Sequence, residues 1–158
     1  MRSLKIYLDT SVISHLDAPD VPDRQDDTLQ LWSEIKSGKY EVYVSEITLT
    51  EINANQERKR QLLLKYLREI EYNLIAVNDD IIKYAEELNR LGILSNKHYL
   101  DCLHLGSAVF SGCDMLLSWN FRHMVKLKTI NGVKYINSLL GYREIGIYAP
   151  SMVIERSE

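Results

Sequence analysis

Short apolar segments that alternate with helical patterns constrain the fold of this chain more than any other feature. Strand-forming residues dominate 4–8, 40–44, 72–77, 115–119 and 146–149, and helices are expected over 28–37, 45–52, 56–70, 78–91, 98–110 and 135–140. Strands that alternate with helices along a chain favour a parallel sheet covered by those helices. The sequence therefore predicts an α/β fold with a central, mostly parallel β-sheet.

A single domain is expected to span the whole chain, residues 1–158. The 158 residues are 46% hydrophobic and 26% charged, a balance typical of one globular domain. The sequence contains no internal repeat and no linker rich in glycine, serine and proline. Two of the three prolines, Pro19 and Pro22, lie among acidic residues in the segment 17–27, for which we expect an exposed connection.

The sequence also lacks the patterns of several classes of protein. No apolar run approaches the roughly 20 residues of a membrane helix, and the N-terminal apolar stretch is too short for a signal peptide, so a cytoplasmic protein with no membrane partner is expected. Cys102 and Cys113 are not spaced as a zinc or disulfide motif and are expected to be buried, reduced thiols. No serine-hydrolase elbow, dinucleotide-binding motif or P-loop is present.

Polar residues follow the predicted strands at positions where α/β sheets bind ligands. Asp9 ends the first strand, Asn120 ends the fourth, and Glu51 comes soon after the second. Asp101 lies in an otherwise apolar helix. Ligands bind outside the carboxyl ends of parallel strands, so these side chains are expected to converge there. Mg²⁺ and Mn²⁺ take hard oxygen ligands, which makes Asp9, Glu51 and Asp101 candidate metal ligands.

Each of these residues also has a structural interpretation. Glu51 fits a capping box that begins at Thr48, and Asp9 fits a helix cap. Capping is the favoured interpretation for Asn120. Asp101, in the middle of a predicted helix, has no capping role, and buried carboxylates are rare without partners, so it is the strongest functional candidate.

The run from His98 through Asp101 to His104 has the composition of a metal site. Residues six positions apart on a helix point in different directions, so the three side chains are not expected to share one ion. A structural role is favoured for both histidines. For His123 a phosphate contact and a helix start remain open.

The charge distribution separates the last quarter of the chain from the rest. The net charge of −3 argues against an indiscriminate polycationic binder of nucleic acid. Residues 121–158 nevertheless carry six Lys and Arg residues against three acids. Arg122, Lys126, Lys128 and Lys134 follow Asn120 and are candidates to hold phosphates beside the acidic cleft, although a solvated charged face is the common alternative.

The order and spacing of these segments resemble the PIN-domain family, in particular the VapC-like toxins of type II toxin–antitoxin systems. The resemblance rests on the segments 6–13, 50–52, 99–105, 117–123, 136–142 and 147–150. It implies a PIN-like, flap-nuclease-like three-layer sandwich and a Mg²⁺- or Mn²⁺-dependent ribonuclease. It also implies a homodimer, an RNA substrate and an inhibitory antitoxin protein.

The resemblance assigns roles to particular residues of this sequence. Asp9, Glu51 and Asp101 match the acidic triad, and Ser11 and Ser118 match hydroxyl positions that orient the ligands. Many family members have an aspartate at the position of Asn120, so here Asn120 is expected as a neutral or water-mediated ligand. Arg122, His123 and Lys126 are expected to contact RNA.

A second function remains open at this point. A PIN scaffold that binds RNA or a protein partner without turnover has the same segments in the same order. Metal-dependent cleavage of RNA distinguishes the enzyme from such a binding module.

Overall fold

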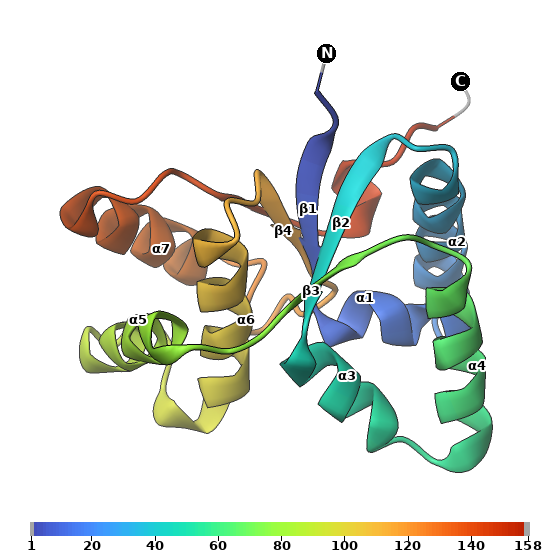
Figure 1. Ribbon diagram of the computed structural model, residues 1–158, viewed down its shortest axis with the longest axis horizontal. Coiled ribbons are helices and arrows are strands. Elements are labelled where there is room, and N and C mark those ends of the chain that lie inside the picture. Colours follow the sequence, from blue (N-terminus) through green and yellow to red (C-terminus); the bar gives the residue numbers. More distant parts are fainter. Residues whose placement is uncertain (1, 157–158) are drawn as a thin grey trace.

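The centre of the molecule is a five-stranded sheet in which every neighbouring pair is parallel (Figure 1). The computed structural model describes residues 2–156. The strands are β1 (Leu4–Leu8), β2 (Tyr40–Ser45), β3 (Asn73–Ile75), β4 (Met115–Leu117) and β5 (Gly146–Tyr148), in the spatial order β3-β2-β1-β4-β5. The predicted parallel α/β fold is confirmed.

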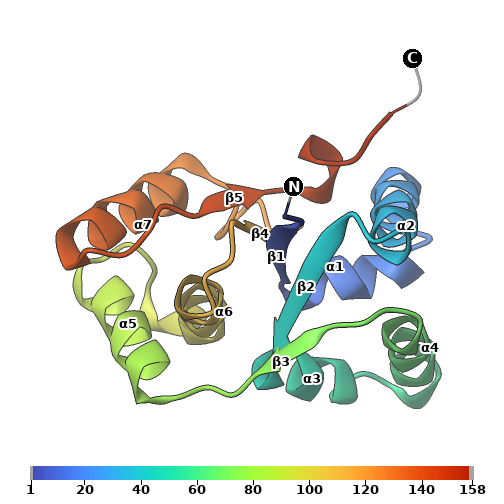
Figure 2. The same ribbon diagram turned by 45° about the horizontal axis from the view of Figure 1, so that its top comes forward.

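Helices cover both faces of this sheet and make a three-layer structure (Figure 2). One layer contains α1 (Thr10–Ser14), α2 (Pro22–Lys36), α3 (Glu46–Asn53) and α4 (Glu57–Arg68). The other contains α5 (Asp79–Arg90), α6 (Tyr99–Phe110) and α7 (Leu127–Leu140). Short 3₁₀ turns η1 (His15–Asp17), η2 (Asn96–His98) and η3 (Pro150–Met152) complete the chain. No helix within residues 2–156 is both long and apolar enough to cross a membrane.

The two helical layers are held by two separate hydrophobic cores. Side chains alternate between the faces of a strand. In β1, Ile6 and Leu8 therefore pack with α1 to α4, whereas Tyr7 packs with α5 to α7. All three side chains are fully buried. Burial on both faces explains why this strand appears in the sequence as a continuous apolar run.

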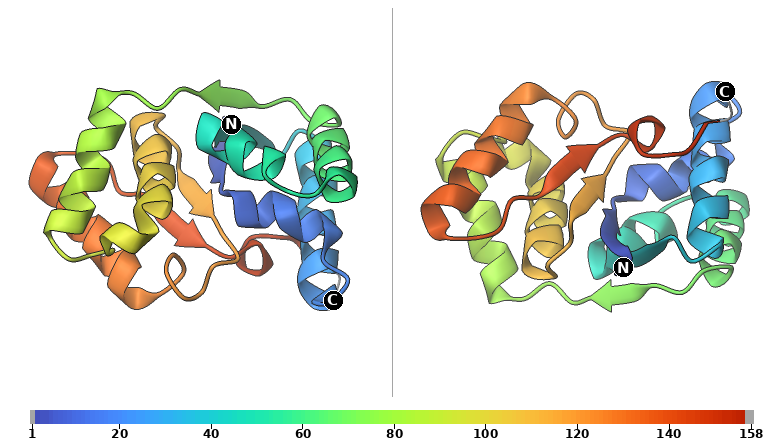
Figure 3. Two further views of the ribbon diagram at one scale, coloured as in Figure 1. Left: turned by 90° about the horizontal axis from the view of Figure 1, so that it is seen from below. Right: turned by 90° about the horizontal axis from the view of Figure 1, so that it is seen from above.

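The carboxyl ends of the strands lie at one edge of the sheet, where α1, α3 and α6 meet (Figure 3, left). The register pairs Leu8 of β1 with Leu117 of β4, and Tyr7 with Tyr43 of β2. The residues that follow these strands therefore lie side by side. This edge is where the sequence places its candidate site.

Two helices begin earlier than the sequence pattern indicated. The exposed connection expected over 17–27 is wrong in its second half, because α2 starts at Pro22 instead of Thr28. Proline at the first helical position is favourable, since its missing N–H has no helical partner there. Similarly, α7 starts at Leu127 and not near Tyr135. Its first two turns contain Lys128 and other polar residues, which interrupt the spacing of apolar residues by which an amphipathic helix is recognised.

A buried hydrogen bond joins α5 to α7 and gives a test of this packing. The Tyr84 hydroxyl donates to Asn137 Oδ1 at 2.7 Å, and Asn137 is 1% exposed. Tyr84→Phe leaves that oxygen without its donor and should lower the free energy of unfolding by about 1–3 kcal/mol. Urea denaturation measures the change. Tyr135→Phe, at a side chain 60% exposed, should change stability little, and equal effects would contradict the assigned role of the bond.

Candidate active site at the carboxyl edge of the sheet

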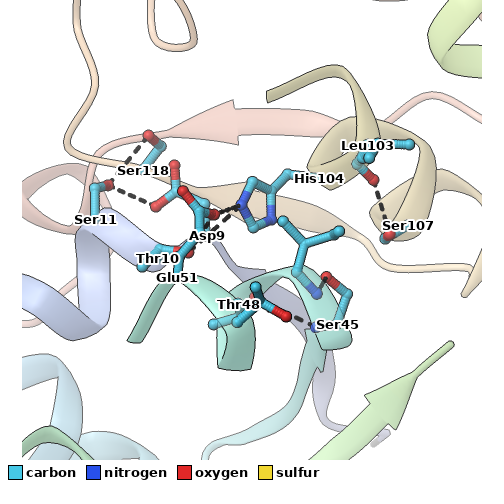
Figure 4. Close-up of polar contacts among 12 residues, drawn as sticks. Asp9, Thr10, Ser11, Ser45, Thr48, Glu51, Leu103, His104, Ser107 and Ser118 are labelled. Carbon is cyan, nitrogen blue, oxygen red and sulfur yellow. Dashed lines mark hydrogen bonds and ion pairs between the residues drawn. The ribbon is translucent and has the colours of Figure 1, made fainter. Parts of the chain in front are cut away.

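Asp9 is the buried centre of the candidate site. It follows β1 directly, is 3% exposed, and caps α1 by accepting the amide of Val12. The Ser11 hydroxyl donates to Asp9 Oδ1 at 2.5 Å and accepts the amide of Trp119 at 2.9 Å (Figure 4). Ser118 Oγ lies 3.4 Å from Ser11 Oγ. The two predicted hydroxyl positions therefore lie beside the carboxylate, linking the end of β1 to the segment after β4.

Glu51 reaches the same edge from α3. Its Oε1 accepts the Thr10 hydroxyl at 2.8 Å and lies 2.7 Å from His104 Nε2 on α6 (Figure 4). The side chain is 34% exposed, whereas that of His104 is 2% exposed. The capping box of α3 is formed by Ser45 and Thr48. The alternative in which Glu51 belongs to a box starting at Thr48 is therefore wrong.

A buried chain of hydrogen bonds supports His104 from its other side. Tyr7 Oη lies 2.6 Å from His104 Nδ1 and donates to Ser45 Oγ at 2.8 Å. With the phenol proton directed to Ser45, the phenol oxygen accepts from Nδ1, while Glu51 accepts from Nε2. An imidazole that donates from both nitrogens is protonated. His104 is thus a positive charge among the acids.

Asp101 approaches from the first turn of α6, one helical turn before His104. The sequence interpretation placed it in mid-helix, but α6 begins at Tyr99, so its charge also suits the positive end of this helix. Within residues 2–156, no side-chain or backbone group donates a hydrogen bond to the carboxylate of Asp101. Asp101 is half-buried; this burial raises its pKa, and the charges of Asp9 and Glu51 raise it further.

Burial and charge shift the pKa values of the site in opposite directions. Desolvation raises the pKa of Asp9, against the charge of His104 and the hydroxyls of Ser11 and Ser118. Desolvation also raises the pKa of Asp101. Burial alone would lower the pKa of His104, but Tyr7, Glu51 and Asp9 outweigh it and raise this pKa to about 10. The pKa of Glu51 is lowered, because His104 and Thr10 outweigh its desolvation.

Asn120 lies next to the site, but its side-chain oxygen is engaged elsewhere. Oδ1 accepts the amides of Arg122 at 3.1 Å and His123 at 2.9 Å. The remaining amide nitrogen is a donor and does not ligate a cation. This geometry favours the capping interpretation and leaves Asn120 shaping the loop after β4.

The predicted phosphate-binding residues lie along that loop. Arg122 and Lys126 are exposed, and the His123 ring stacks on His98 with a centroid distance of 3.6 Å. Lys128 follows in the first turn of α7. Lys134 instead points to Glu144, with the charged atoms 3.7 Å apart, so it does not belong to this group.

His104 is the residue whose part in the site the sequence interpretation missed. The sequence pattern pairs it with His98, six positions away, and favours a structural role for both. Asp101 and His104 are three residues apart, however, and such residues share a helix face. That spacing was the available signal, and it places both side chains toward Asp9 and Glu51.

The residues present suit a magnesium-type ion better than a zinc-type ion. Residues 2–156 contain no group of three or more His, Cys, Asp and Glu side chains already arranged around one metal position. Mg²⁺ does not need such a cage, because it keeps several waters and binds through one or two carboxylates. Asp9 and Asp101 have raised pKa values that a nearby cation would reverse. The donor set therefore fits a hard divalent ion.

Comparison with known proteins identifies the family. The family model described as "PIN domain" matches residues 6–123, which include all four candidate residues Asp9, Glu51, Asp101 and Asn120. This chain belongs to the PIN-domain family. A search of the curated proteins gave no match.

Solved structures share the fold of this PIN domain over almost the whole chain. A chain from VapBC2 of Rickettsia felis, bound to a promoter DNA fragment, aligns with a TM-score of 0.53 at 17% identity, over 92% of this chain and 98% of that one. For DNA-bound VapBC from Salmonella typhimurium the values are 0.54, 16%, 93% and 98%. For VapBC-1 from nontypeable Haemophilus influenzae they are 0.55, 15%, 94% and 99%. At these identities the likeness establishes the fold.

The buried charge of Asp9 should reduce the stability of the metal-free protein. Asp9→Asn keeps an oxygen that can accept from Ser11 and Val12 but removes the buried charge. We expect its free energy of unfolding at pH 7 in EDTA to rise by about 0.5–2 kcal/mol, the usual stability gain when a functional site is neutralised. Urea denaturation of both proteins measures this. A less stable Asp9→Asn protein would show that the carboxylate is a structural cap.

The raised pKa of His104 gives a pH dependence of stability. The unfolded imidazole titrates near pH 6.5 and the folded one near 10. The stabilisation is therefore complete below about pH 6.5 and is lost as the pH rises toward 10. Between pH 7 and 8.5 the free energy of unfolding in EDTA should fall by up to about 1.4 kcal/mol per pH unit, and His104→Gln should remove this part of the slope. A neutral His104 ring by ¹⁵N NMR at pH 7.5 would contradict the assignment.

Proposed function

We propose that this PIN domain is a divalent-metal-dependent endoribonuclease, the toxin component of a type II toxin–antitoxin pair. One observation carries the proposal: the buried Asp9 carboxylate lies at the carboxyl edge of a PIN-fold sheet, and its charge and that of Glu51 both act on the carboxyl of Asp101. Carboxylates gathered in this way repel one another without a cation. Their grouping therefore supports a function that uses one.

Asp9 and Asp101 would hold the ion, with Glu51 as the third acidic ligand. A divalent ion at this position supplies a water of lowered pKa and positive charge for the phosphate as its charge develops. Ser11 fixes the rotamer of Asp9 by donating to one oxygen. His104 and Thr10 fix Glu51 in the same way. Because these supports are buried or half-buried, the acids are oriented before substrate arrives.

RNA is the substrate class that the surroundings favour. Arg122, His123 and Lys126 lie in the segment capped by Asn120, which follows Ser118 at the end of β4, and there they would bind phosphates of the bound strand. The compared structures are VapBC complexes, which supports an antitoxin protein as partner for this chain. A homodimer remains part of the proposal through the same resemblance.

A PIN scaffold that binds RNA or a protein without turnover is the second candidate. The observation in its favour is the ion pair between Glu51 and His104, which already gives one acid a cationic partner. In that case the acids and His104 would form a structural network, and metal binding would be weak or absent. Metal-dependent turnover separates the two functions.

Cleavage of RNA by the purified chain tests the proposal. With Mn²⁺ or Mg²⁺ we expect cleavage that EDTA abolishes and that Asp101→Asn reduces by about 100-fold or more, since each acid holds the ion whose charge stabilises the transition state. Gel analysis of an end-labelled RNA measures the rates. Asp20→Asn, an exposed aspartate away from the site, is the matched control. Equal cleavage by Asp101→Asn, or cleavage in EDTA, would contradict the nuclease proposal.

A further inference from the structure

A small pocket beside the acidic site is lined by an unusual concentration of positive and imidazole side chains. It has a volume of about 180 Å³ and lies between the end of α5 and the start of α7. The polar residues that line it are Ser95, His98, Arg122, His123, Lys126, Lys128 and Thr129. No acidic residue lines it. The volume is below the roughly 300–1,000 Å³ of pockets that hold drug-sized ligands, so a small anionic group is the better fit.

The positive charges in this pocket have no acidic partners within residues 2–156. Elsewhere in residues 2–156, basic residues such as Arg2, Lys39 and Arg58 form ion pairs. Over the same described range, no carboxylate lies within 4.0 Å of the charged atoms of the pocket's arginine and lysines. The pocket therefore keeps a positive potential that an anion from outside can satisfy.

The position of the lysines on α7 is a second, independent sign of an anionic ligand. Lys126 is the N-cap residue, its side chain makes no capping hydrogen bond, and the first turn contains no acidic residue. Cations at a helix N-terminus are unfavourable, because the free N–H groups there already carry partial positive charge. The same end of a helix binds phosphate readily. Lys126 and Lys128 thus add positive charge where the helix already carries it, and a bound anion would offset both.

The histidine pair connects the pocket to the acidic site. His98 stacks on His123 at 3.6 Å within the pocket and lies three residues before Asp101, at the start of α6. Thr129 donates to the carbonyl of His123 at 2.5 Å and fixes the loop. The pocket is therefore joined to the acidic site through the start of α6, and none of the three acids lines it.

We propose that this pocket binds one phosphate group of the RNA substrate, held by Lys126, Lys128 and Arg122 against the stacked His98 and His123 rings. The inference rests on the proposed function and adds to it a defined phosphate position outside the acidic cluster. The group is either the terminal phosphate of a strand or an internal phosphodiester. Both present negatively charged non-bridging oxygens to the pocket, and binding experiments can separate them.

The first experiment uses inorganic phosphate with the full chain in EDTA. NMR signals of the His98 and His123 rings should shift on titration, while that of His15, which packs against Trp119, should not. Sodium chloride at matched ionic strength is the control. Uniform shifts of all the histidines, or none, would overturn the proposal.

The second experiment compares charge-matched variants. Lys126→Gln/Lys128→Gln removes two pocket charges, and Lys65→Gln/Lys83→Gln removes two exposed charges on α4 and α5. In phosphate-free buffer the pocket variant should melt no lower than the wild type, because it loses cations at a helix N-terminus. Phosphate should raise the melting temperature of the wild type and the control but not of the pocket variant. A pocket variant that phosphate still stabilises would refute the site.

RNA binding in EDTA, followed by fluorescence anisotropy, identifies the source of the phosphate. The pocket variant should bind a short single strand about tenfold or more weaker than the control, with a salt slope smaller by about 0.7 for each lost phosphate contact. A gain in affinity from a 5′-phosphate that only the wild type shows assigns the terminal group, and equal affinity with and without it assigns an internal one. Unchanged RNA affinity overturns the proposal. If the wild-type chain binds phosphate in the pocket but does not cleave RNA, that result would instead count against the nuclease function.

Discussion

The burial of one carboxylate, Asp9, is the constraint on which the rest of the site depends. A charge that is 3% exposed costs several kcal/mol unless its surroundings compensate. Ser11, the amide of Val12 and the positive charge of His104 provide that compensation, and the raised pKa of Asp9 shows that it is incomplete. The position is fixed because β1 lies at the centre of the sheet, with both of its faces covered. The fold thus holds the Asp9 carboxylate at a buried position, where its charge is least stable and where a nearby cation would stabilise it.

His104 supplies part of the positive charge that Asp9 requires from within the chain. It is enclosed by Tyr7 and Glu51, so its charge does not depend on a ligand or on solvent. Its positive charge also weakens the repulsion among the carboxylates of Asp9, Glu51 and Asp101. Ionised together, the three carboxylates carry three negative charges and the imidazolium carries one positive charge, which leaves two negative charges at the site. One divalent cation neutralises that remainder, whereas a monovalent one leaves a buried charge.

The sheet could be predicted from sequence because burial on both faces leaves a direct signal. All five strands form in the segments expected, with β2 one residue longer than expected, and Asp9 and Glu51 lie at the predicted edge. Helix starts were less visible, since α2 begins with a proline that the sequence interpretation assigned to a loop. Its first turn is polar because it lies at the surface, and polarity alone does not distinguish a helix turn from a loop.

The side-chain partners within the site could not be predicted, because they depend on contacts between distant segments. His104 meets Glu51 across 53 positions and Tyr7 across 97. Its protonation is set by these neighbours and not by α6. The positions of the pocket lysines, Lys126 and Lys128, are also hard to predict from sequence. Their number is evident in the sequence, but their place at the start of α7 depends on where that helix begins.

The acidic site and the basic pocket are connected through the start of α6, where His98 lines the pocket and Asp101 follows three residues later, and this has a consequence for how a strand would bind. An RNA backbone is repelled by carboxylates and attracted by lysines, so alone it would favour the pocket over the acids. A cation at the acids reverses the repulsion there and leaves the attraction at the pocket unchanged. Binding at the pocket and binding at the acids are then distinct events, with His98 between them. Anchoring a neighbouring phosphate first would limit where the reacting phosphate can lie, which is how positioning contributes to rate.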